Sequence, residues 1–335
     1  MYIFFLEVVI FIISIFLVLK FKIFFTKKFK LIDIPNDRKL HKRPTPILGG
    51  IISFFLLIEF FIIHYLINSQ FYNLMYLYLP ITLFFIGIYD DAYDLKANSK
   101  LFLITLVFFV LLMIFPEFKL LKLNFSTFNF SIETGYFALI FTVLCLLLFL
   151  NASNMIDGIN GLFLGVNIIF FLYLLLSYNF NNTFVLSFLT ILSLLFYCNC
   201  RNLFFMGDSG VFLISSILSV SLIEAYHSEV SNLKSVEEIF ILLMIPGLDM
   251  FRIFLERIIN KKNPFKADRN HFHHLLGKNF NDQYTLAIYL FLVALGPFIY
   301  QLKIINESVL IIILITLFYY LTYHLKKLPN YMTKI

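Results

Sequence analysis

Apolar stretches long enough to cross a lipid bilayer recur along the whole of this 335-residue chain. Its residues are 61% hydrophobic and only 14% charged, whereas a soluble domain of this size would be about 25% charged. An α-helix needs about 20 apolar residues to cross the hydrocarbon layer, and it satisfies its own backbone groups there. The pattern predicts an all-α, polytopic membrane helix bundle with about eleven spans (10–11). The expected spans are 2–19, 47–67, 74–90, 101–115, 136–151, 159–177, 183–199, 210–225, 238–255, 284–301 and 308–324.

Basic residues divide unevenly between the predicted loops. The first span has no basic residue before it and several after it, so it is expected to be an uncleaved anchor with its N-terminus outside. Alternation from there places 22 of the 26 Lys and Arg residues on the inner side and four outside, as the positive-inside rule requires. An odd number of spans puts the C-terminus in the cytoplasm. The spans leave no room for a separate soluble domain, so we expect one transmembrane domain over residues 1–335.

Acidic residues are also unevenly divided. All ten aspartates fall on the predicted inner side, whereas nine of the ten glutamates lie in outer loops or within spans. Because acids contribute little to topology, a one-sided set of short carboxylates predicts a site that handles a metal ion and phosphate groups. The expected catalytic loops lie near 20–46, 90–100, 151–160, 199–210 and 256–283. The net charge of +6 is explained by basic inner loops beside anionic lipid, so no nucleic-acid partner is expected.

Two inner segments carry specific chemistry. Asp90 and Asp91 close the third predicted span, where neighbouring carboxylates repel each other at the negative end of the helix dipole. A cation or a proton transfer would explain them; solvated surface acids are the alternative. Asn154 and Asp157 are three positions apart and would share one face of a helical turn. Both side chains offer the oxygen ligands that Mg²⁺ prefers. The alternative interpretation is that this segment is only a capped turn between two helices.

Two segments near predicted span ends carry weaker signals. Lys42 lies in a basic loop that suits an anionic partner, and Gly49-Gly50, which follows it, permits close backbone approach to a ligand or to another helix. Asp208 opens the eighth predicted span, either as a helix cap or beside free amides that would seat a phosphate.

The last two segments combine acids with bases. Asp249 lies within the ninth predicted span, where an acid indicates a functional site; an ion pair with Arg252 is the alternative. In the last inner loop, three of the seven histidines fall within four positions, near Arg269. Such histidines suit hydrogen bonds to a pyrophosphate or a sugar better than a zinc site, which needs more ligands at set spacings. A pH-sensitive surface loop also remains open.

Taken together and in order, these segments resemble the polyprenyl-phosphate N-acetylhexosamine-1-phosphate transferase family, glycosyltransferase family 4. The matching segments are Arg38-Lys39…His41…Pro44…Pro46…Gly49-Gly50, Asp90-Asp91…Asp94-Leu95, Asn151…Asn154…Asp157-Gly158…Gly161, Gly207-Asp208-Ser209-Gly210, the Asp249 helix and Phe265…Ala267-Asp268…His271…His273-His274.

Two details of these segments look like one branch of the family. The branch that transfers phospho-N-acetylmuramoyl-pentapeptide usually has a lysine at the third position after the aspartate pair, and three consecutive histidines. This chain instead has Asp94-Leu95 and a His-x-His-His arrangement after Ala267-Asp268. Both features look like the branch that uses UDP-N-acetylglucosamine or a related hexosamine.

The resemblance implies transfer of a HexNAc-1-phosphate, with GlcNAc-1-phosphate first among them, from a UDP-sugar to undecaprenyl phosphate with release of UMP. The cofactor would be Mg²⁺, or alternatively Mn²⁺. Two mechanisms are compatible with the resemblance: direct attack by the lipid phosphate, and a route through a covalent aspartyl intermediate. The reaction would initiate an O-antigen, common-antigen or teichoic-acid-linkage glycan on the cytoplasmic side of a bacterial inner membrane, and relatives permit a homodimer. Implied roles are catalytic for Asp90 and Asp91, metal-binding for Asn154 and Asp249, and substrate-binding for Lys42, Thr45, Asp157, Gly158, Asp208, Arg269, His271, His273 and His274.

Two other functions remain open. One is the phospho-N-acetylmuramoyl-pentapeptide transferase of peptidoglycan synthesis. The other is a transporter or divalent-cation channel, because acids inside spans also line ion paths. Ion conduction would place polar residues at mid-depth in several spans, yet these regions are almost uniformly apolar apart from Glu59. Carboxylates confined to one side favour an interfacial enzyme.

Overall fold

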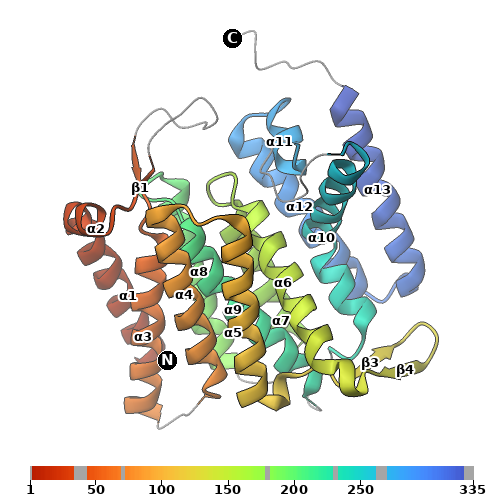
Figure 1. Cartoon of the computed structure of the whole chain (residues 1–335), viewed down its shortest axis with the longest axis horizontal. Coiled ribbons are helices and arrows are strands. Elements are labelled where there is room, and N and C mark those ends of the chain that lie inside the picture. The colour runs from red at the N-terminus through yellow and green to blue at the C-terminus, as the bar shows by residue number, and fades with distance from the viewer. Residues whose placement is uncertain are drawn as a thin grey trace. The chain divides into compact units, whose positions relative to one another are not determined.

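The computed structural model describes residues 2–33, 44–68, 72–177, 182–228, 233–261 and 270–327 (Figure 1). Each predicted span coincides with one helix, with most ends within a few residues of the expected ones. These helices are α1 Tyr2–Lys20, α3 Gly49–Asn68, α4 Met75–Tyr93, α5 Ala97–Ile114, α6 Ala138–Ile156, α7 Leu162–Ser177, α8 Asn182–Cys200, α9 Gly207–His227, α10 Val236–Ile259, α12 Asp282–Gln301 and α13 Glu307–Lys327.

Shorter elements connect these helices. They are α2 Lys22–Phe29, α11 Phe272–Gly277, the 3₁₀ turns Pro116–Phe118 and Gly135–Phe137, and the strands β1 Ile32–Asp33, β2 Thr45–Pro46, β3 Lys122–Phe125 and β4 Phe130–Glu133. Both strand pairs are antiparallel.

Seven of the described helices are long and apolar enough to cross a membrane, and the bent pair α1–α2 makes an eighth if it forms one span. Among the others, α7 has only 16 residues. Helix α4 has Asp90 and Asp91 in its last turn, and α10 carries acidic and basic side chains along its length. The predicted class, an all-α polytopic membrane protein, is therefore confirmed.

The chain divides into two compact units, each built from segments far apart in the sequence. Unit 1 comprises residues 1–119 and 181–223, and unit 2 comprises residues 120–180 and 224–335. The expectation of a single domain over the whole chain stays a prediction.

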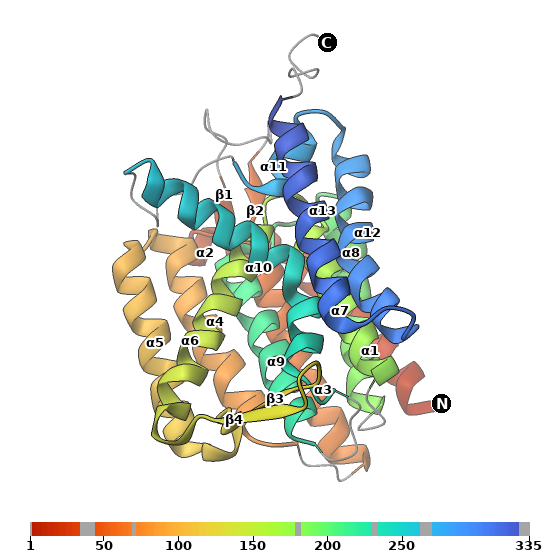
Figure 2. The same ribbon diagram turned by 90° about the vertical axis from the view of Figure 1, so that its right-hand side faces the viewer.

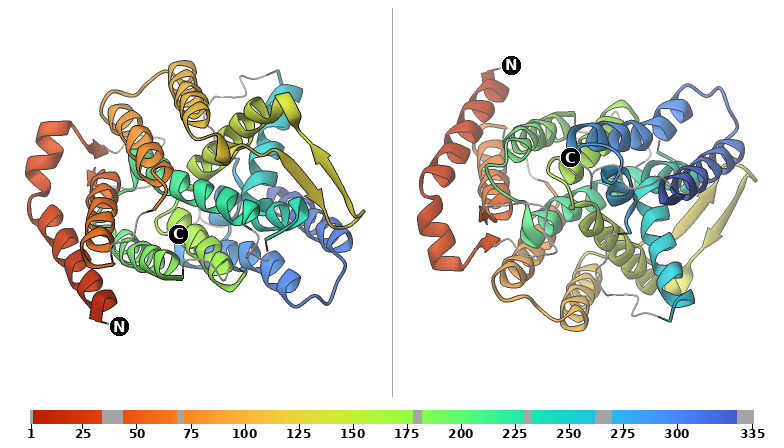
Figure 3. Two further views of the ribbon diagram at one scale, coloured as in Figure 1. Left: turned by 90° about the horizontal axis from the view of Figure 1, so that it is seen from below. Right: turned by 90° about the horizontal axis from the view of Figure 1, so that it is seen from above.

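In unit 1, α1, α3 and α8 pack against one another, and α4 packs between α3 and α5; Figure 3 shows α1 running along α3. A buried polar network connects α1, α3 and α8 near the end of α3 that is opposite Gly49. Glu7 Oε1 lies 2.6 Å from His64 Nε2, and Glu7 Oε2 accepts a hydrogen bond of 2.7 Å from the Ser187 hydroxyl. The Tyr72 hydroxyl lies 2.8 Å from His64 Nδ1. Mutual pairing makes these polar groups tolerable among apolar helices.

In unit 2, α10 contacts α6, α12 and α13, and α7 contacts α12. Helix α10 contains Pro246, which removes one backbone hydrogen bond, and Figure 2 shows the helix bent along its length. The turn between β3 and β4 is held at the start of α10, because the backbone N–H groups of Ser126 and Thr127 donate to Glu237.

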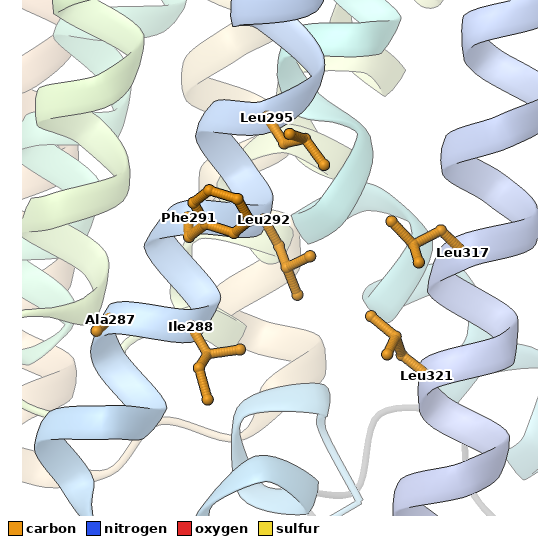
Figure 4. A pocket seen from close by; sticks show the side chains of 7 residues that line it. All are labelled: Ala287, Ile288, Phe291, Leu292, Leu295, Leu317 and Leu321. Carbon is orange, nitrogen blue, oxygen red and sulfur yellow. The ribbon is translucent and has the colours of Figure 1, made fainter.

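An apolar groove of about 530 Å³ lies between α12 and α13. In Figure 4, Leu292 and Leu295 of α12 point toward Leu317 and Leu321 of α13 across this groove. Phe272 of α11 packs nearby against both helices, with its ring 5.8 Å from that of Tyr289 and 5.2 Å from that of Phe318. These contacts place α11, and the histidines that flank Phe272, against α12 and α13.

Candidate active site

In unit 1, the segment before α9 is held against the start of α3. Gly49 N–H donates to Phe205 O over 2.9 Å, and Gly50 N–H donates to Met206 O over 3.2 Å. A Cβ atom built on Gly50 would lie 2.0 Å from Ser209 Oγ, and one on Gly87 of α4 would lie 2.4 Å from Ser209 Cα. Glycine therefore lets α3 and α4 approach the first turn of α9, so the Gly49-Gly50 pair serves helix packing.

The Asp91 carboxylate, from the last turn of α4, occupies the N-terminus of α9. Its Oδ1 accepts from Asp208 N–H over 2.8 Å, and its Oδ2 accepts from Ser209 N–H over 3.1 Å and from the Ser209 hydroxyl over 2.5 Å. Gly207 makes the approach possible with a φ of +67° and no side chain, since a Cβ there would lie 2.6 Å from Asp91 Oδ2. The backbone amides of Asp208 and Ser209, which in one of the two interpretations would bind a phosphate, thus donate to Asp91 instead. The negative charge of Asp91 suits the positive end of the helix dipole.

Lys100 bridges the two other carboxylates of this cluster. Its Nζ lies 2.8 Å from Asp90 Oδ2 and 2.5 Å from Asp208 Oδ2, and Asp90 Oδ1 accepts from Leu95 N–H over 2.7 Å. Two carboxylates therefore share one ammonium group, and Asp91 lies beside them at the start of α9. Acids outnumber bases in this cluster, which suits it to a cation or a proton. In the sequence, Lys100 counts only as one of the basic residues that indicate the inner side of the membrane. Because α5 begins at Ala97 rather than 101, Lys100 belongs to the helix and faces the acids.

In unit 2, Asp249 of α10 is 2% exposed and fully hydrogen-bonded. Arg252 Nη2 donates to its Oδ1 over 2.7 Å, Phe272 N–H contacts both oxygens at 3.0 and 3.1 Å, and His271 Nδ1 lies 3.1 Å from Oδ2. Arg252 also donates to Asn270 O over 2.6 Å. The ion pair with Arg252, one of the two alternatives at this position, is confirmed. The contacts of Asp249 with Phe272 and of Arg252 with Asn270 join α10 to the start of α11.

Three histidine rings gather at α11. The His273 ring lies 5.8 Å from that of His271, nearly parallel to it, and 4.1 Å from that of His274. His273 is 1% exposed. Burial, aided by the charge of neighbouring His274, holds the pKa of His273 well below its ordinary value, so the ring is neutral. A Cβ on Gly158 would lie 2.2 Å from His273 Nε2, so the absence of a side chain at Gly158 lets two predicted segments of unit 2 meet.

The remaining predicted residues are placed as follows. Thr45 lies in β2 and pairs with Asp33 of β1. Asn154 lies in the last turn of α6, and Asp157 follows that helix, with its N–H 3.4 Å from Asn154 O. Lys42 and Arg269 lie outside the described residues.

The two predicted metal ligands, Asn154 and Asp249, both offer oxygen atoms, which are the ligands that Mg²⁺ prefers. In the described ranges, no three His, Cys, Asp or Glu side chains are arranged to hold a metal ion. Asp249 and Asn154 have the right donor chemistry, but the Asp249 carboxylate already accepts hydrogen bonds from Arg252 and Phe272 and contacts His271. A cation at Asp249 would therefore replace the Arg252 or His271 contact. Only the chemistry of these donors, a carboxylate and an amide oxygen, is that of a magnesium site.

Comparisons with known proteins agree with these motifs. Residues 73–226 match the model of glycosyl transferase family 4; this stretch contains Asp90, Asp91, Asn154, Asp157 and Asp208. Proteins named undecaprenyl-phosphate alpha-N-acetylglucosaminyl 1-phosphate transferase are also similar.

The relative from Escherichia coli K12 is 30% identical over 279 residues, which cover 79% of this chain and 75% of the relative. The relatives from Salmonella typhimurium LT2, 29% identical with the same coverage, and Thermotoga maritima, 28% identical over 79% of each chain, agree. The order of the motifs, the family match and this similarity lead to one conclusion: the chain belongs to the glycosyl transferase family 4 enzymes.

Proposed function

We propose that this enzyme transfers a HexNAc-1-phosphate, with GlcNAc-1-phosphate as the first choice, from a UDP-sugar to undecaprenyl phosphate. The observation that carries the proposal is the Asp90, Asp91, Asp208 and Lys100 cluster, whose acids lie within the stretch that matches the family. The names of the similar proteins from Escherichia coli and Thermotoga maritima, undecaprenyl-phosphate alpha-N-acetylglucosaminyl 1-phosphate transferase, support it. The product would initiate a lipid-linked surface glycan.

The proposed reaction exchanges one phosphoanhydride bond for another. An oxygen of the lipid phosphate attacks the phosphorus that carries the sugar and forms a new P–O bond. The bond from that phosphorus to the UMP oxygen breaks, and UMP departs with the electron pair. The chemistry needs positioned groups and charge neutralisation more than covalent help from the protein.

Asp90 is our candidate for removing a remaining proton from the lipid phosphate. Its carboxylate contacts one side-chain partner, the Lys100 ammonium, and one backbone N–H, that of Leu95. Asp91, by contrast, uses both oxygens to hold α9. We therefore assign the base to Asp90 and a positioning role to Asp91, which separates two residues that the sequence treated alike.

In unit 2 we propose that Asp249 and Asn154 hold Mg²⁺. The ion, when bound, would neutralise charge on the pyrophosphate. Asp157, Gly158 and the histidines of α11 would contact the nucleotide or the sugar. Support comes from the neutral, buried His273, whose Nε2 lies against the exposed Gly158.

We further propose eleven spans with the N-terminus outside, the C-terminus in the cytoplasm and the active site on the cytoplasmic side of a bacterial inner membrane. Every predicted span coincides with a helix, which supports the proposed number of eleven spans. The division of 22 basic residues inside and four outside supports the direction.

Purified protein tests the function directly. With undecaprenyl phosphate and Mg²⁺, a panel of UDP-hexosamines should release UMP, and UDP-GlcNAc should be the best donor. Chelation with EDTA should stop release, and Mg²⁺ or Mn²⁺ should restore it. UMP release that does not depend on undecaprenyl phosphate, or a preference for UDP-N-acetylmuramoyl-pentapeptide, would contradict the proposal.

A further inference from the structure

Two buried polar side chains of unit 2 have no hydrogen-bond partner among the described residues. They are the Tyr289 hydroxyl of α12 and both ring nitrogens of His273. Their residues are 0% and 1% exposed, respectively. A buried polar group without a partner destabilises the fold, so such groups in one place indicate a state of the protein in which they are paired.

The two groups are neighbours. The rings of His273 and Tyr289 lie 6.5 Å apart at an angle of 64°, and Phe272, between His271 and His273 in the sequence, packs against Tyr289. His273 Nε2 also lies close to the backbone of Gly158, which is exposed. His273 is therefore a neighbour of both a surface glycine and the Tyr289 ring.

Packing alone does not explain a tyrosine at this position. Phenylalanine would fill the same space beside Phe272 without burying a hydroxyl. Tyr300, also on α12, shows the usual arrangement, since its hydroxyl donates to Glu307 over 3.3 Å. The unpaired hydroxyl of Tyr289 thus calls for a partner that the described residues do not supply in this arrangement.

We propose that Tyr289 is a positioning residue for His273: on donor-substrate binding its hydroxyl donates a hydrogen bond to one ring nitrogen, so that the other ring N–H points to the sugar diphosphate. This inference rests on the proposed function. A neutral imidazole has one donor and one acceptor nitrogen, and the partner of one nitrogen determines the role of the other. Hydrogen bonds of this kind are often long without substrate and tighten when it binds.

The Tyr289→Phe variant tests the role, with Tyr300→Phe as its matched control on the same helix. Tyr289→Phe should lower kcat/KM for UDP-GlcNAc about tenfold, the effect of one lost hydrogen bond. Its melting temperature without substrate should stay equal to wild type or rise, because a buried unpaired hydroxyl is gone. Tyr300→Phe should show the opposite pattern, with near wild-type turnover and a lower melting temperature. Wild-type kcat/KM in Tyr289→Phe would overturn the proposal.

A double-variant cycle distinguishes positioning from general packing. In a His273→Gln background, the Tyr289→Phe change should cause no further loss of kcat/KM, because the residue on which it acts is absent. A full additional tenfold loss in that background would also overturn the proposal.

A direct readout of the His273 ring does not require turnover. In protein with ¹⁵N-labelled histidine and saturating UDP-GlcNAc, the His273 ring shifts should report one fixed tautomer in wild type and a mixture in Tyr289→Phe. Identical shifts in the two proteins would contradict the role of Tyr289. If the wild-type protein released no UMP at all, that result would instead contradict the proposed function.

Discussion

The Asp91 carboxylate accepts hydrogen bonds from both the backbone N–H and the hydroxyl of Ser209, 118 positions later in the chain. One side chain of α4 thereby fixes the start of α9, where Asp208 meets Lys100. The two adjacent aspartates of this motif thus have different surroundings, and their substitutions should have different consequences.

Asp90→Asn and Asp91→Asn should each lower turnover by at least about 100-fold, as for loss of a general base or of its support. Asp91→Asn should lower the melting temperature more than Asp90→Asn, because the Asp91 carboxylate accepts three hydrogen bonds from the start of α9, whereas Asp90 accepts one from the Leu95 N–H and one from Lys100, which keeps Asp208 as a partner. Turnover assays and thermal unfolding of both variants in detergent check this. Equal thermal losses, or high activity in Asp90→Asn, would contradict the separate roles.

Lys100→Met should reduce activity strongly and destabilise unit 1. It removes the ammonium between Asp90 and Asp208, and charge-assisted hydrogen bonds of this kind contribute about 1.5–3 kcal/mol. Lys96→Met, at the exposed position just before α5, is the matched control and should retain activity and stability. The measurements are UMP release and thermal unfolding. If both variants behaved alike, Lys100 would have only the topological role of an inner basic residue.

Gly158→Ala should reduce activity because the new methyl group would lie 2.2 Å from His273 Nε2 and must displace the ring. Gly247→Ala on α10 is the control, since no atom lies within 4 Å of a Cβ there; alanine also favours a helix by about 1 kcal/mol over glycine. Steady-state kinetics should show the loss only in Gly158→Ala. Normal kinetics in that variant would remove the His273 contact from the proposed site.

Stability should depend on pH through His273, whose pKa is held well below its ordinary value by burial and by neighbouring His274. In the unfolded chain the ring gains a proton near pH 6.5, while the folded ring does not. Stability from this residue is therefore complete above about pH 6.5 and falls as the pH decreases, by at most about 1.4 kcal/mol per pH unit. Melting temperatures between pH 7 and pH 5 should fall more steeply for wild type than for His273→Gln. Parallel curves would argue against a buried neutral ring.

Cysteine labelling tests the membrane topology. In a background without Cys145, Cys198 and Cys200, single cysteines at Asn98 and Lys278 should react with an impermeant maleimide only after the cells are permeabilised. Cysteines at the exposed Lys122 and Lys303 should react in intact cells. If positions 98 and 278 were labelled from opposite sides of the membrane, the proposal of an active site on the cytoplasmic side would be wrong.

Much of the architecture was predictable because helix formation in a membrane depends on local properties. Apolar length and the distribution of basic residues predicted the position of every long helix. Short motifs in a constant order, such as Asp90-Asp91 and His271 to His274, also predicted the family. Each of these features can be recognised within a single window of the sequence.

The tertiary structure decided which partner each polar side chain has. It pairs Asp91 with Ser209, Lys100 with Asp208 and Asp249 with Arg252, and it brings Gly158 to His273. Except for the Asp249–Arg252 pair, these contacts join residues more than 100 positions apart. The sequence by itself determined the helices, the topology to be expected and the chemical inventory. Hydrogen bonding and burial depend on atoms that only packing brings together, so the roles within that inventory depended on the fold.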